Sequence, residues 1–473
     1  MHDSNDERGG ASPRLCLINP SNPLVSTVRI KQNRWNRYRV WKPLGLLTIA
    51  GATPPEWAIS ILDENMGRPD YAALTRPDLV GITAFASQAN RAYEVAAHFR
   101  RLGVPVVMGG IHASTRTAEA MERVDAVVTG EAEGIWPQVL DDARRGALKP
   151  RYDGGRSDLD HVPPARHDLL PKGYLLGAIQ TTRGCPLSCS FCSVTAVNGA
   201  QYRQRPIADV VQELGLIREK RLLVVDDNLI GTRPEHVARA KDLFRAIAAA
   251  DLRKQWIAQV TINFADDEEL MTLARRAGCR GVFIGFESAA PEGLGEIGKK
   301  FNLRGGRDFR ASVGRIQRHK ILVVGSFVLG LDIDGPGIGR RVDEAARRYG
   351  VDNLNALFLT PLPGTRLWDQ MEADDRILLD HFPQDWSHYT LGFPVARYAR
   401  LTTDEIIGEM DTCARSFYSW PRIARRVGGD FWHLRQPLRS LVSNLAHRSN
   451  VRMNCEAHAT FRRERGNGGT PYT

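Results

Sequence analysis

Three closely spaced cysteines give the 473-residue sequence its clearest chemical signal. Cys185, Cys189 and Cys192 form a Cys-x-x-x-Cys-x-x-Cys pattern directly after an apolar run that predicts a strand. Three thiolates on one loop can each ligate one iron of a cubic iron–sulfur cluster, which leaves the fourth iron open to bind and reduce a substrate. A structural zinc site or an electron-transfer cluster would need a fourth Cys or His, and none stands nearby at a suitable spacing.

The cysteines belong to the second of two regions in which strands and helices alternate. Such alternation predicts parallel sheets with helices on their faces and with ligands bound beyond the carboxyl ends of the strands. Residues 14–145 predict a doubly wound parallel sheet, with strands at 15–18, 58–63, 79–84, 104–108 and 124–129. Residues 177–365 predict a partial (β/α)6 barrel, with strands at 177–182, 222–226, 256–261, 281–285, 321–328 and 354–360.

The segments outside these two regions have little periodicity or a different one. We expect residues 1–13 to be a disordered leader and residues 146–176, rich in Gly, Pro, Arg and Asp, to be a linker. Residues 366–465 predict loops and then a helical C-terminal region, with a helix that starts at Thr403 and has acidic residues in its first turn. Residues 466–473 are expected to be a frayed tail.

The composition of the chain indicates in which cellular compartment the protein works and which kinds of partner it binds. The formal net charge of +10 permits contact with anionic ligands, but it is spread along the chain and no appended nucleic-acid-binding domain is evident. No stretch approaches the roughly 18 apolar residues of a membrane span, and the polar first residues do not resemble a secretory signal. Seven cysteines, with three of them clustered, favour metal ligation in a reducing compartment over disulfides. We therefore expect a cytoplasmic protein with no membrane span and no nucleic-acid partner.

The cysteine loop, with the aromatic Phe191 before its last cysteine, resembles that of the radical S-adenosylmethionine superfamily. The resemblance implies that a [4Fe-4S] cluster on the three cysteines binds S-adenosylmethionine and cleaves it reductively. It also implies contacts to this cofactor from residues at the ends of the barrel strands. The residues expected to bind the cofactor are Phe191, Asp226, Asp227, Asn228, Glu287 and Ser326.

Residues 14–145 resemble the cobalamin-binding domain that precedes the radical domain in one large subclass. The resemblance implies that cobalamin binds at loops that follow the strands, at Thr83, Gly109, Gly110, Gly130 and Glu131. Some corrinoid proteins have an Asp-x-His motif whose His binds cobalt from below, but this chain has Asp63-Glu64-Asn65 there. The domain either binds cobalamin without that ligand or is a scaffold that has lost it. His112 is expected to be a hydrogen-bonding loop residue rather than a cobalt ligand.

Together the resemblances imply a cobalamin-dependent methyltransferase that acts on a small biosynthetic substrate and takes electrons from a donor such as a flavodoxin or ferredoxin. Two alternatives stay open. The same cluster could drive cyclisation, rearrangement or 3-amino-3-carboxypropyl transfer without methyl transfer. The chain could also be an iron–sulfur protein that binds or modifies RNA. The sequence assigns no catalytic residue beyond those expected to bind cofactors, and it leaves the substrate open.

Overall fold

The computed structural model describes residues 12–22, 24, 42–432 and 436–466. The described residues fall into two compact units, one made of those within Met1–Ser21 and Pro43–Lys172 and the other of those within Asn22–Lys42 and Gly173–Thr473. Residues 1–11 of the expected leader and 467–473 of the expected tail lie outside the described part. The first residue of that tail, Gly466, is the last residue of a helix.

A six-stranded parallel sheet in the order β2-β1-β3-β4-β5-β6 forms the centre of the first unit. The chain begins near the middle of the sheet and adds strands on both sides, which confirms the predicted doubly wound sheet. The strands are β1 (Arg14–Asn19), β2 (Ala58–Asp63), β3 (Leu79–Thr83), β4 (Val106–Gly109), β5 (Ala126–Thr129) and β6 (Arg151–Asp153). β6 lies within the segment expected to be a linker, and it pairs with β5.

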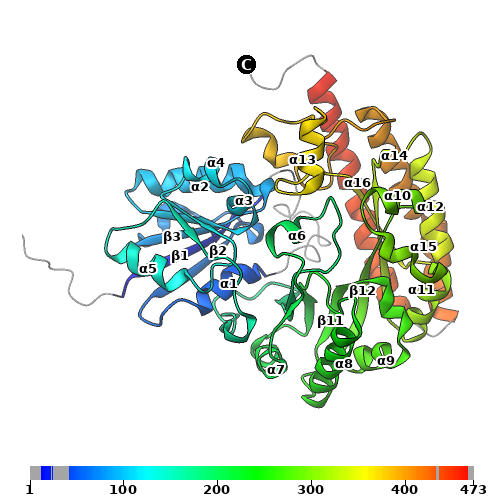
Figure 1. The fold of residues 1–473 in the computed structure, drawn as a ribbon, viewed down its shortest axis with the longest axis horizontal. Coiled ribbons are helices and arrows are strands. Elements are labelled where there is room, and N and C mark those ends of the chain that lie inside the picture. Colours follow the sequence, from blue (N-terminus) through cyan, green and yellow to red (C-terminus); the bar gives the residue numbers. More distant parts are fainter. Residues whose placement is uncertain (1–11, 23, 25–41, 433–435, 467–473) are drawn as a thin grey trace, which may run out of the picture. The chain divides into compact units, whose positions relative to one another are not determined.

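Helices cover both faces of this sheet, with α2 and α4 on one side and α1 on the other (Figure 1). They form because apolar residues recur at helical spacing, as in α2, where Ala92, Tyr93 and Phe99 are buried on one face. The helices are α1 (Leu44–Gly51), α2 (Ala89–Arg101), α3 (Gly110–Thr115), α4 (Thr117–Met121) and α5 (Trp136–Arg144). Short 3-10 turns span Glu64–Met66, Tyr71–Ala73, Ala86–Gln88 and Leu159–His161.

The second unit contains a six-stranded parallel sheet in the order β14-β13-β12-β11-β10-β7. Each strand lies next to its predecessor in this series, and β14 does not pair with β7, so the sheet is the predicted partial barrel. Its strands are β7 (Gly177–Ile179), β10 (Arg221–Val224), β11 (Gln255–Val260), β12 (Cys279–Glu287), β13 (Leu322–Leu329) and β14 (Asn353–Phe358). A separate antiparallel pair joins β8 (Thr182–Arg183) and β9 (Arg203–Gln204).

Helices follow the barrel strands and cover the outer face of the sheet, as α8, α9, α11 and α12 show in Figure 1. The helices of the second unit are α6 (Ser193–Val197), α7 (Ile207–Leu216), α8 (Pro234–Ala249), α9 (Glu268–Arg276), α10 (Pro291–Glu296), α11 (Phe309–Arg318), α12 (Ile338–Tyr349), α13 (Arg366–Ala373), α14 (Thr403–Phe417), α15 (Trp420–Trp432) and α16 (Pro437–Gly466). Three further 3-10 turns span Ile262–Asp266, Lys300–Gly306 and Gln384–His388.

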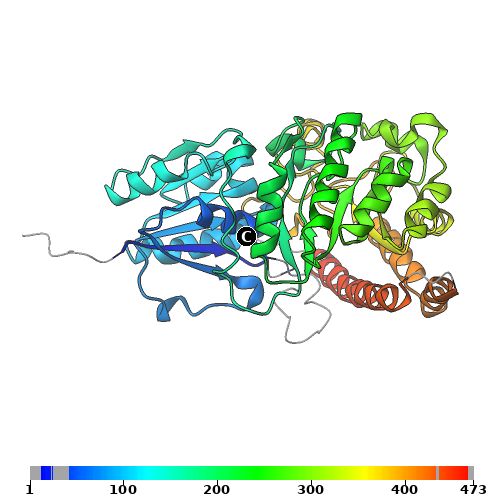
Figure 2. The same ribbon diagram turned by 90° about the horizontal axis from the view of Figure 1, so that it is seen from below.

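The C-terminal helices pack beside β14, which is the last strand of the barrel sheet. α14 begins at Thr403 as predicted, and its cap is Thr402, whose hydroxyl accepts a hydrogen bond from Glu405 N while the Glu405 carboxylate accepts one from Thr402 N. α16 contains 30 residues and contacts β14, α14 and α15. Figure 2 shows it as a single long red helix.

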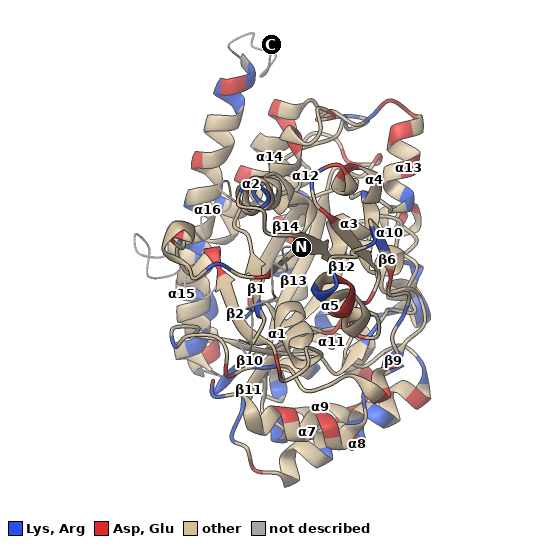
Figure 3. Ribbon diagram, turned by 90° about the vertical axis from the view of Figure 1, so that its left-hand side faces the viewer, with Lys and Arg blue, Asp and Glu red and all other residues tan. Residues whose placement is uncertain are grey.

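Charges of both signs are mixed on the outer helices of the second unit (Figure 3). Between α8 and α9, Lys241 pairs with Asp267 at 2.7 Å and Arg245 pairs with Glu269 at 2.5 Å. In the described part of the chain, no helix has both the length and the apolar character that crossing a membrane requires.

An ion pair between the buried Glu64 and Arg91 joins the segments after β1 and β2 to the helix α2. Glu64 is fully buried, and Arg91 of α2 donates to its carboxylate at 2.6–3.0 Å. Ser21 N and the Tyr71 hydroxyl donate to it as well, each at 3.0 Å. Burial alone would raise the pKa of Glu64, but the hydrogen bonds from Arg91, Ser21 and Tyr71 and the charge of Arg91 outweigh it and lower the pKa. Glu64 is therefore ionised at neutral pH.

Replacing Glu64 by Gln should destabilise the first unit by about 3 kcal/mol, because it leaves the half-buried Arg91 charge without its main partner. The measurement is hydrogen exchange of the β1 and β3 amides, which reports the free energy of opening. Glu94→Gln is the matched control, because Glu94 binds the same arginine at 2.7 Å from an exposed position. It should cost less than about 0.5 kcal/mol. Equal effects of the two variants would contradict the assigned role of Glu64.

Candidate functional site

The three cysteines lie on one loop between β8 and α6, beyond the carboxyl end of β7. Cys189 is buried, and Cys185 and Cys192 are half-buried. Their sulfur atoms do not all lie within 4.8 Å of one another, as ligands of a single metal ion would. A cubic cluster, in which each thiolate takes its own iron, fits this wider spacing. The backbone N–H groups of Leu187 and Val194 lower the pKa of Cys185 and Cys192, respectively, because they favour the thiolate.

Burial raises the pKa of all three thiols, that of Cys189 to about 12. The thiols are therefore protonated at neutral pH when they hold no metal, and ligation of iron must release their protons. The nearby Lys299 ammonium acts in the opposite direction on each of them, since a positive charge favours the thiolate.

Two consecutive carboxylates beyond β10 anchor the cysteine loop. Asp226 is 1% exposed and accepts hydrogen bonds from Thr181 N at 2.6 Å and from the Thr181 and Thr182 hydroxyls at 2.5 and 3.0 Å. Burial outweighs these bonds and raises the pKa of Asp226 to about 6. Asp227 accepts from Gly184 N at 2.8 Å and from the Asn198 amide at 2.9 Å. The two carboxylates thus bind the chain before the cysteine loop, at its start and after it. Their contact with S-adenosylmethionine stays a prediction.

Asn228 and Phe191 also lie at the loop. The Asn228 side chain lies near enough to the Cys185 thiol to lower its pKa, and it donates to the Thr261 hydroxyl at 3.3 Å. Phe191 is half-buried within the loop itself. These two residues are therefore placed beside the predicted cluster ligands, and their contacts with the cofactor stay predictions.

Residues that follow β12 and β14 in the chain form hydrogen bonds to the middle of the cysteine loop. Arg366 donates to Ser188 O at 2.6 Å, Ser190 N donates to Ile297 O at 3.1 Å, and Leu367 N donates to Ser190 O at 3.0 Å. The sequence did not predict these hydrogen bonds, because nothing local to Ile297 or Arg366 indicates a partner more than a hundred residues away.

A buried ion pair at the end of β12 lies next to the cysteines. Glu287 and Lys299 are 7% and 8% exposed, and Lys299 Nζ lies 2.5 Å from Glu287 Oε1. Glu287 has a positive φ of 63°, and the register with β13 shifts between Gly285 and Glu287, so the strand bulges here. A Cβ on Gly285 would come within 2.0 Å of the Glu287 carboxylate, which explains the glycine. The sequence predicted Glu287, but it gave no signal for Lys299, one of two consecutive lysines.

Ser326 lies beside this pair on the inner face of the sheet. It stands in register with Gly285 of β12 and Asn355 of β14, and the Asn355 amide donates to its hydroxyl at 3.5 Å. The structure thus brings Glu287 and Ser326 together at neighbouring strands, near the cysteine loop. Their contact with S-adenosylmethionine stays a prediction.

In the first unit, the small residues predicted to bind cobalamin lie at the carboxyl ends of adjacent strands. Thr83 stands in register with Gly109, and β3 borders β1 at the point where the strand order reverses. Ligands of doubly wound sheets bind at this point. Gly110 has a φ of 90°, and a Cβ there would lie 2.6 Å from the Thr83 hydroxyl oxygen. The close approach of two backbones therefore needs this glycine.

Gly130 and Glu131 follow the next strand of the same sheet, and both contact the segment after β6. A Cβ on Gly130 would lie 2.5 Å from Gly155 O, and Glu131 N donates to that oxygen at 3.0 Å. The Glu131 carboxylate accepts from Ser157 N at 3.0 Å. Gly130 and Glu131 thus determine how the loop after β5 packs against the segment after β6. Their contact with cobalamin stays a prediction.

Asn65 and His112 are the two residues of this unit that bear on whether a side chain would ligate the cobalt of a bound corrinoid. The Asn65 amide donates to the Asp63 carboxylate at 2.8 Å, so it folds back on the preceding turn. His112 is fully buried, and its Nε2 lies 2.8 Å from the Tyr93 hydroxyl. His112 therefore packs inside the unit and forms the expected hydrogen bond, but it lies in the helix α3 and not in a loop. The donor set at this edge, small residues and backbone groups, fits a broad ring that approaches the main chain.

Replacing Gly184 by Ala should collapse the cysteine loop. Gly184 has a φ of 84°, and a Cβ there would lie 2.1 Å from Gln201 O, so the loop must move. We expect the variant to lose most of the about four irons that a reconstituted cluster would hold. The measurement is iron per chain after anaerobic reconstitution. Gly215→Ala, on α7 with open space around its Cβ position, is the control and should keep its iron. Full iron in the Gly184 variant would show that the loop does not depend on this turn.

Comparisons with known proteins agree with this geometry. A family model described as the radical SAM superfamily matches residues 179–333, and a model described as the B12 binding domain matches residues 34–140. The chain is 29% identical over 400 residues to bacteriochlorophyllide d C-12(1)-methyltransferase of Chlorobaculum tepidum, an alignment that covers 82% of this chain and 85% of that relative. It is 26% identical to hopanoid C-2 methylase of Rhodopseudomonas palustris, with 72% of this chain and 66% of that relative covered.

A solved structure shares the fold. It is the radical S-adenosylmethionine methyltransferase TsrM from Kitasatospora setae with cobalamin and a [4Fe-4S] cluster bound. The TM-score is 0.60 at 22% identity, and the match covers 77% of this chain and 78% of that one. The cysteine loop on a partial barrel and the doubly wound sheet ahead of it coincide with the two matched family models. The chain therefore belongs to the radical S-adenosylmethionine superfamily, in the subclass whose members carry a B12-binding domain.

Proposed function

We propose that this radical S-adenosylmethionine enzyme transfers a methyl group, by way of cobalamin, to a carbon atom of a large and mostly apolar small molecule. The observation that carries the proposal is the presence in one chain of a three-cysteine loop on a partial barrel and a B12-binding sheet. The named relatives support the substrate class, because a bacteriochlorophyllide and a hopanoid are both polycyclic molecules with large apolar surfaces.

In this proposal the residues of the second unit hold the cluster and orient S-adenosylmethionine. Cys185, Cys189 and Cys192 each bind one iron. Glu287 and Ser326 contact S-adenosylmethionine from the barrel strands, and Phe191, Asp226, Asp227 and Asn228 do so from the loop and its anchor. When bound, the cluster supplies the electron that cleaves S-adenosylmethionine, and cobalamin supplies a methyl carrier that no side chain can replace.

The residues of the first unit form the proposed cobalamin edge. The small side chains at this edge leave the backbone accessible to the broad ring of cobalamin. They belong to Thr83, Gly109 and Gly110. Gly130 and Glu131 form the neighbouring part of that edge. Asn65 stands where some corrinoid proteins have a histidine, and its amide donates to Asp63, so this turn would supply no imidazole to the cobalt of a bound corrinoid.

Reduction of the cluster needs an outside source of electrons, and we propose a small donor such as a flavodoxin or ferredoxin. We also place the protein in the cytoplasm. All seven cysteines are free thiols, which suits a reducing compartment, and the three in the loop must stay reduced to bind iron.

The products of S-adenosylmethionine test the reaction type. Cobalamin-dependent methyl transfer should give S-adenosylhomocysteine and 5′-deoxyadenosine together, because one molecule supplies the methyl group and another supplies the radical. Cys189→Ala should abolish the 5′-deoxyadenosine, since one iron loses its ligand. The measurement is chromatography of anaerobic reactions with the reconstituted enzyme and a reductant.

Cys16→Ala is the control for that variant, because it removes a buried thiol of β1 and leaves the cysteine loop untouched. It should keep iron and cleavage. A main product of 5′-methylthioadenosine would assign 3-amino-3-carboxypropyl transfer, and 5′-deoxyadenosine without S-adenosylhomocysteine would assign cyclisation or rearrangement. Either result would overturn methyl transfer.

Cobalt content tests the first unit. Gly109 has an extended backbone, and a Cβ there would make only ordinary contacts, 3.7 Å from Val128 O. Gly109→Trp should therefore fold, place an indole at the proposed cobalamin edge and lower the cobalt content about tenfold by crowding the site. The measurement is cobalt per chain in protein purified without oxygen from cells supplied with a corrinoid.

Gly110 is unsuited to this test, because any side chain there strains a left-handed backbone and meets Thr83. Gly215→Trp, on α7 of the second unit, is the control and should keep its cobalt. If Gly109→Trp also keeps its cobalt, cobalamin does not bind at this edge. If the unchanged protein holds no cobalt, the corrinoid has no part in the reaction.

A further inference from the structure

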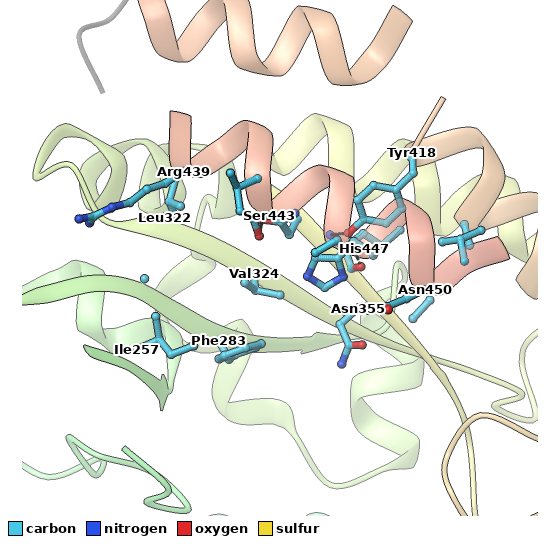
Figure 4. A pocket seen from close by; sticks show the side chains of 18 of the residues that line it. Ile257, Phe283, Leu322, Val324, Asn355, Tyr418, Arg439, Ser443, His447 and Asn450 are labelled. Carbon is cyan, nitrogen blue, oxygen red and sulfur yellow. Dashed lines mark hydrogen bonds between the residues drawn. The ribbon is translucent and has the colours of Figure 1, made fainter. Parts of the chain in front are cut away.

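A cavity of about 900 Å³ lies inside the second unit, between the inner face of the barrel sheet and α16. Figure 4 shows Ile257, Phe283 and Val324 on the strands across the cavity from Ser443 and His447 on the helix. The volume is in the range of pockets that enclose a small molecule.

The wall that α16 contributes is one continuous stripe of the helix. Arg439, Val442, Ala446 and Asn450 all line the cavity, at the spacing of three or four residues that places side chains on one helix face. The polar groups of this wall are mostly satisfied within the protein. Ser443 donates to Asn353 at 2.9 Å, and next to α16 the hydroxyl of Tyr418, at the end of α14, donates to Leu354 O at 2.7 Å. The inner surface is therefore apolar over most of its length.

Asn450 is an exception in this wall. Its side-chain oxygen is buried and has no hydrogen-bond partner in the described part of the chain. Buried acceptors are rarely left without a donor, because the lost hydration costs free energy. The oxygen is thus available to a donor group on a bound molecule.

Arginines gather at one end of the cavity, at the amino ends of the strands. Arg221 begins β10 and stands in register with Gln255, whose side-chain oxygen accepts from Arg439 at 2.9 Å. Arg280, near the start of β12, lines the same end and donates only to backbone carbonyls, at 2.9 and 3.3 Å. Among the residues that the structure describes, no carboxylate forms an ion pair with Arg221, Arg280 or Arg439. The acidic residue Asp411 also lines the cavity, but it is paired with His458 at 2.8 Å.

The electrostatics of this end are unfavourable without a ligand. Burial, and then repulsion from Arg275 and Arg439, lowers the pKa of Arg280 to about 10. Burial and repulsion from Arg275 and Arg221 lower the pKa of Arg439 as well. An anion placed among these guanidinium groups would remove the repulsion and satisfy their free N–H groups.

The other end of the cavity points toward the cofactor residues. Phe283 and Val324 line the cavity, and two residues further along the same strands stand Gly285 and Ser326. Two residues of a strand span about 7 Å, and the seven from Arg280 to Glu287 span about 23 Å. One elongated molecule can therefore extend from the arginines to the edge of the S-adenosylmethionine site.

We infer that this cavity binds the substrate, and that the substrate is an elongated, mainly apolar molecule that ends in a carboxylate or phosphate. Arg221, Arg280 and Arg439 hold the anionic end, the apolar body lies along α16, and the opposite end reaches Gly285 and Ser326. The inference rests on the proposed function, since it names the substrate class of that reaction.

Binding of chain-like probes to the full-length, reconstituted protein tests the inference. The probes are dodecanoate, dodecyl phosphate and dodecanol, followed by calorimetry without reductant or S-adenosylmethionine. Either or both anions should bind at least about tenfold more tightly than the alcohol, as a charge-assisted hydrogen bond requires. The tighter anion identifies the terminal group. Equal binding of all three, or no binding of any, overturns the inference.

Arg280→Met and Arg439→Met should each weaken anion binding about tenfold and leave dodecanol binding unchanged, because each removes one guanidinium group and keeps an apolar stem. Arg276→Met, on the exposed side of α9, is the matched control and should change neither. Val442→Trp should block all three probes by filling the cavity. Unchanged anion binding in both arginine variants contradicts the assigned site, and their circular dichroism shows whether they are folded.

The direction of binding decides whether the occupant is the substrate. A fatty acid with a diazirine at its last carbon should label peptides that contain residues 281–287 and 322–327 on irradiation. The isomer with the diazirine beside the carboxylate should label the start of α16. The reverse pattern, or labelling of surface peptides alone, overturns the substrate assignment. None of these measurements depends on turnover, so a failure of methyl transfer and a failure of this inference are told apart.

Discussion

Two neighbouring carboxylates, Asp226 and Asp227, hold the loop on which the chemistry of the second unit depends. They follow the end of β10 and bind different partners: Asp226 accepts from Thr181 and Thr182 ahead of the loop, and Asp227 accepts from Gly184 within it. Burying an ionised carboxyl group is costly, as the raised pKa of Asp226 shows, and the cost is offset only by several hydrogen bonds. Each bond to a charged acceptor contributes about 1.5–3 kcal/mol. The hydrogen bonds to Asp226 and Asp227 therefore position the loop that carries the three thiols, and they do not require bound iron.

The parts that could be predicted from the sequence are those with local signals. Apolar runs of strand length, separated by helical periodicity, predicted both sheets, and the spacing of Cys185, Cys189 and Cys192 predicted the loop. β6 was missed, since a three-residue strand within a Gly- and Pro-rich segment has no pattern of its own and forms by pairing with β5. Lys299 and Arg366 were missed for a related reason. Their partners Glu287 and Ser188 lie 12 and 178 residues away, and only the folded barrel brings them together.

In the first unit, the turn that in some corrinoid proteins carries a cobalt-binding histidine has a structural role instead. Where some corrinoid proteins supply an imidazole, this chain has Asp63-Glu64-Asn65, and each of these side chains is held inside the unit. Asp63 accepts hydrogen bonds from Asn65, while Glu64 is the buried centre of the network with Arg91 and Tyr71. The turn thus stabilises the junction of β2, β1 and α2 instead of presenting a ligand. A side chain fastened by several hydrogen bonds is unavailable to a metal, so the cobalt of a bound corrinoid would take no nitrogen from this turn.

The incomplete barrel explains why the second unit has room for a long molecule. In a closed eight-stranded barrel the inward side chains fill the interior, and the ligand is confined to the loops at the carboxyl end. Here six strands stop short of closure, and a helix lies across the inner face instead of further strands. A 30-residue helix is about 45 Å long, more than the height of the sheet, so α16 can line the whole interior with one stripe of side chains. Because that stripe carries Val442 and Ala446 as well as polar side chains and ends in Arg439, it fits the proposed substrate with an apolar body and an anionic end.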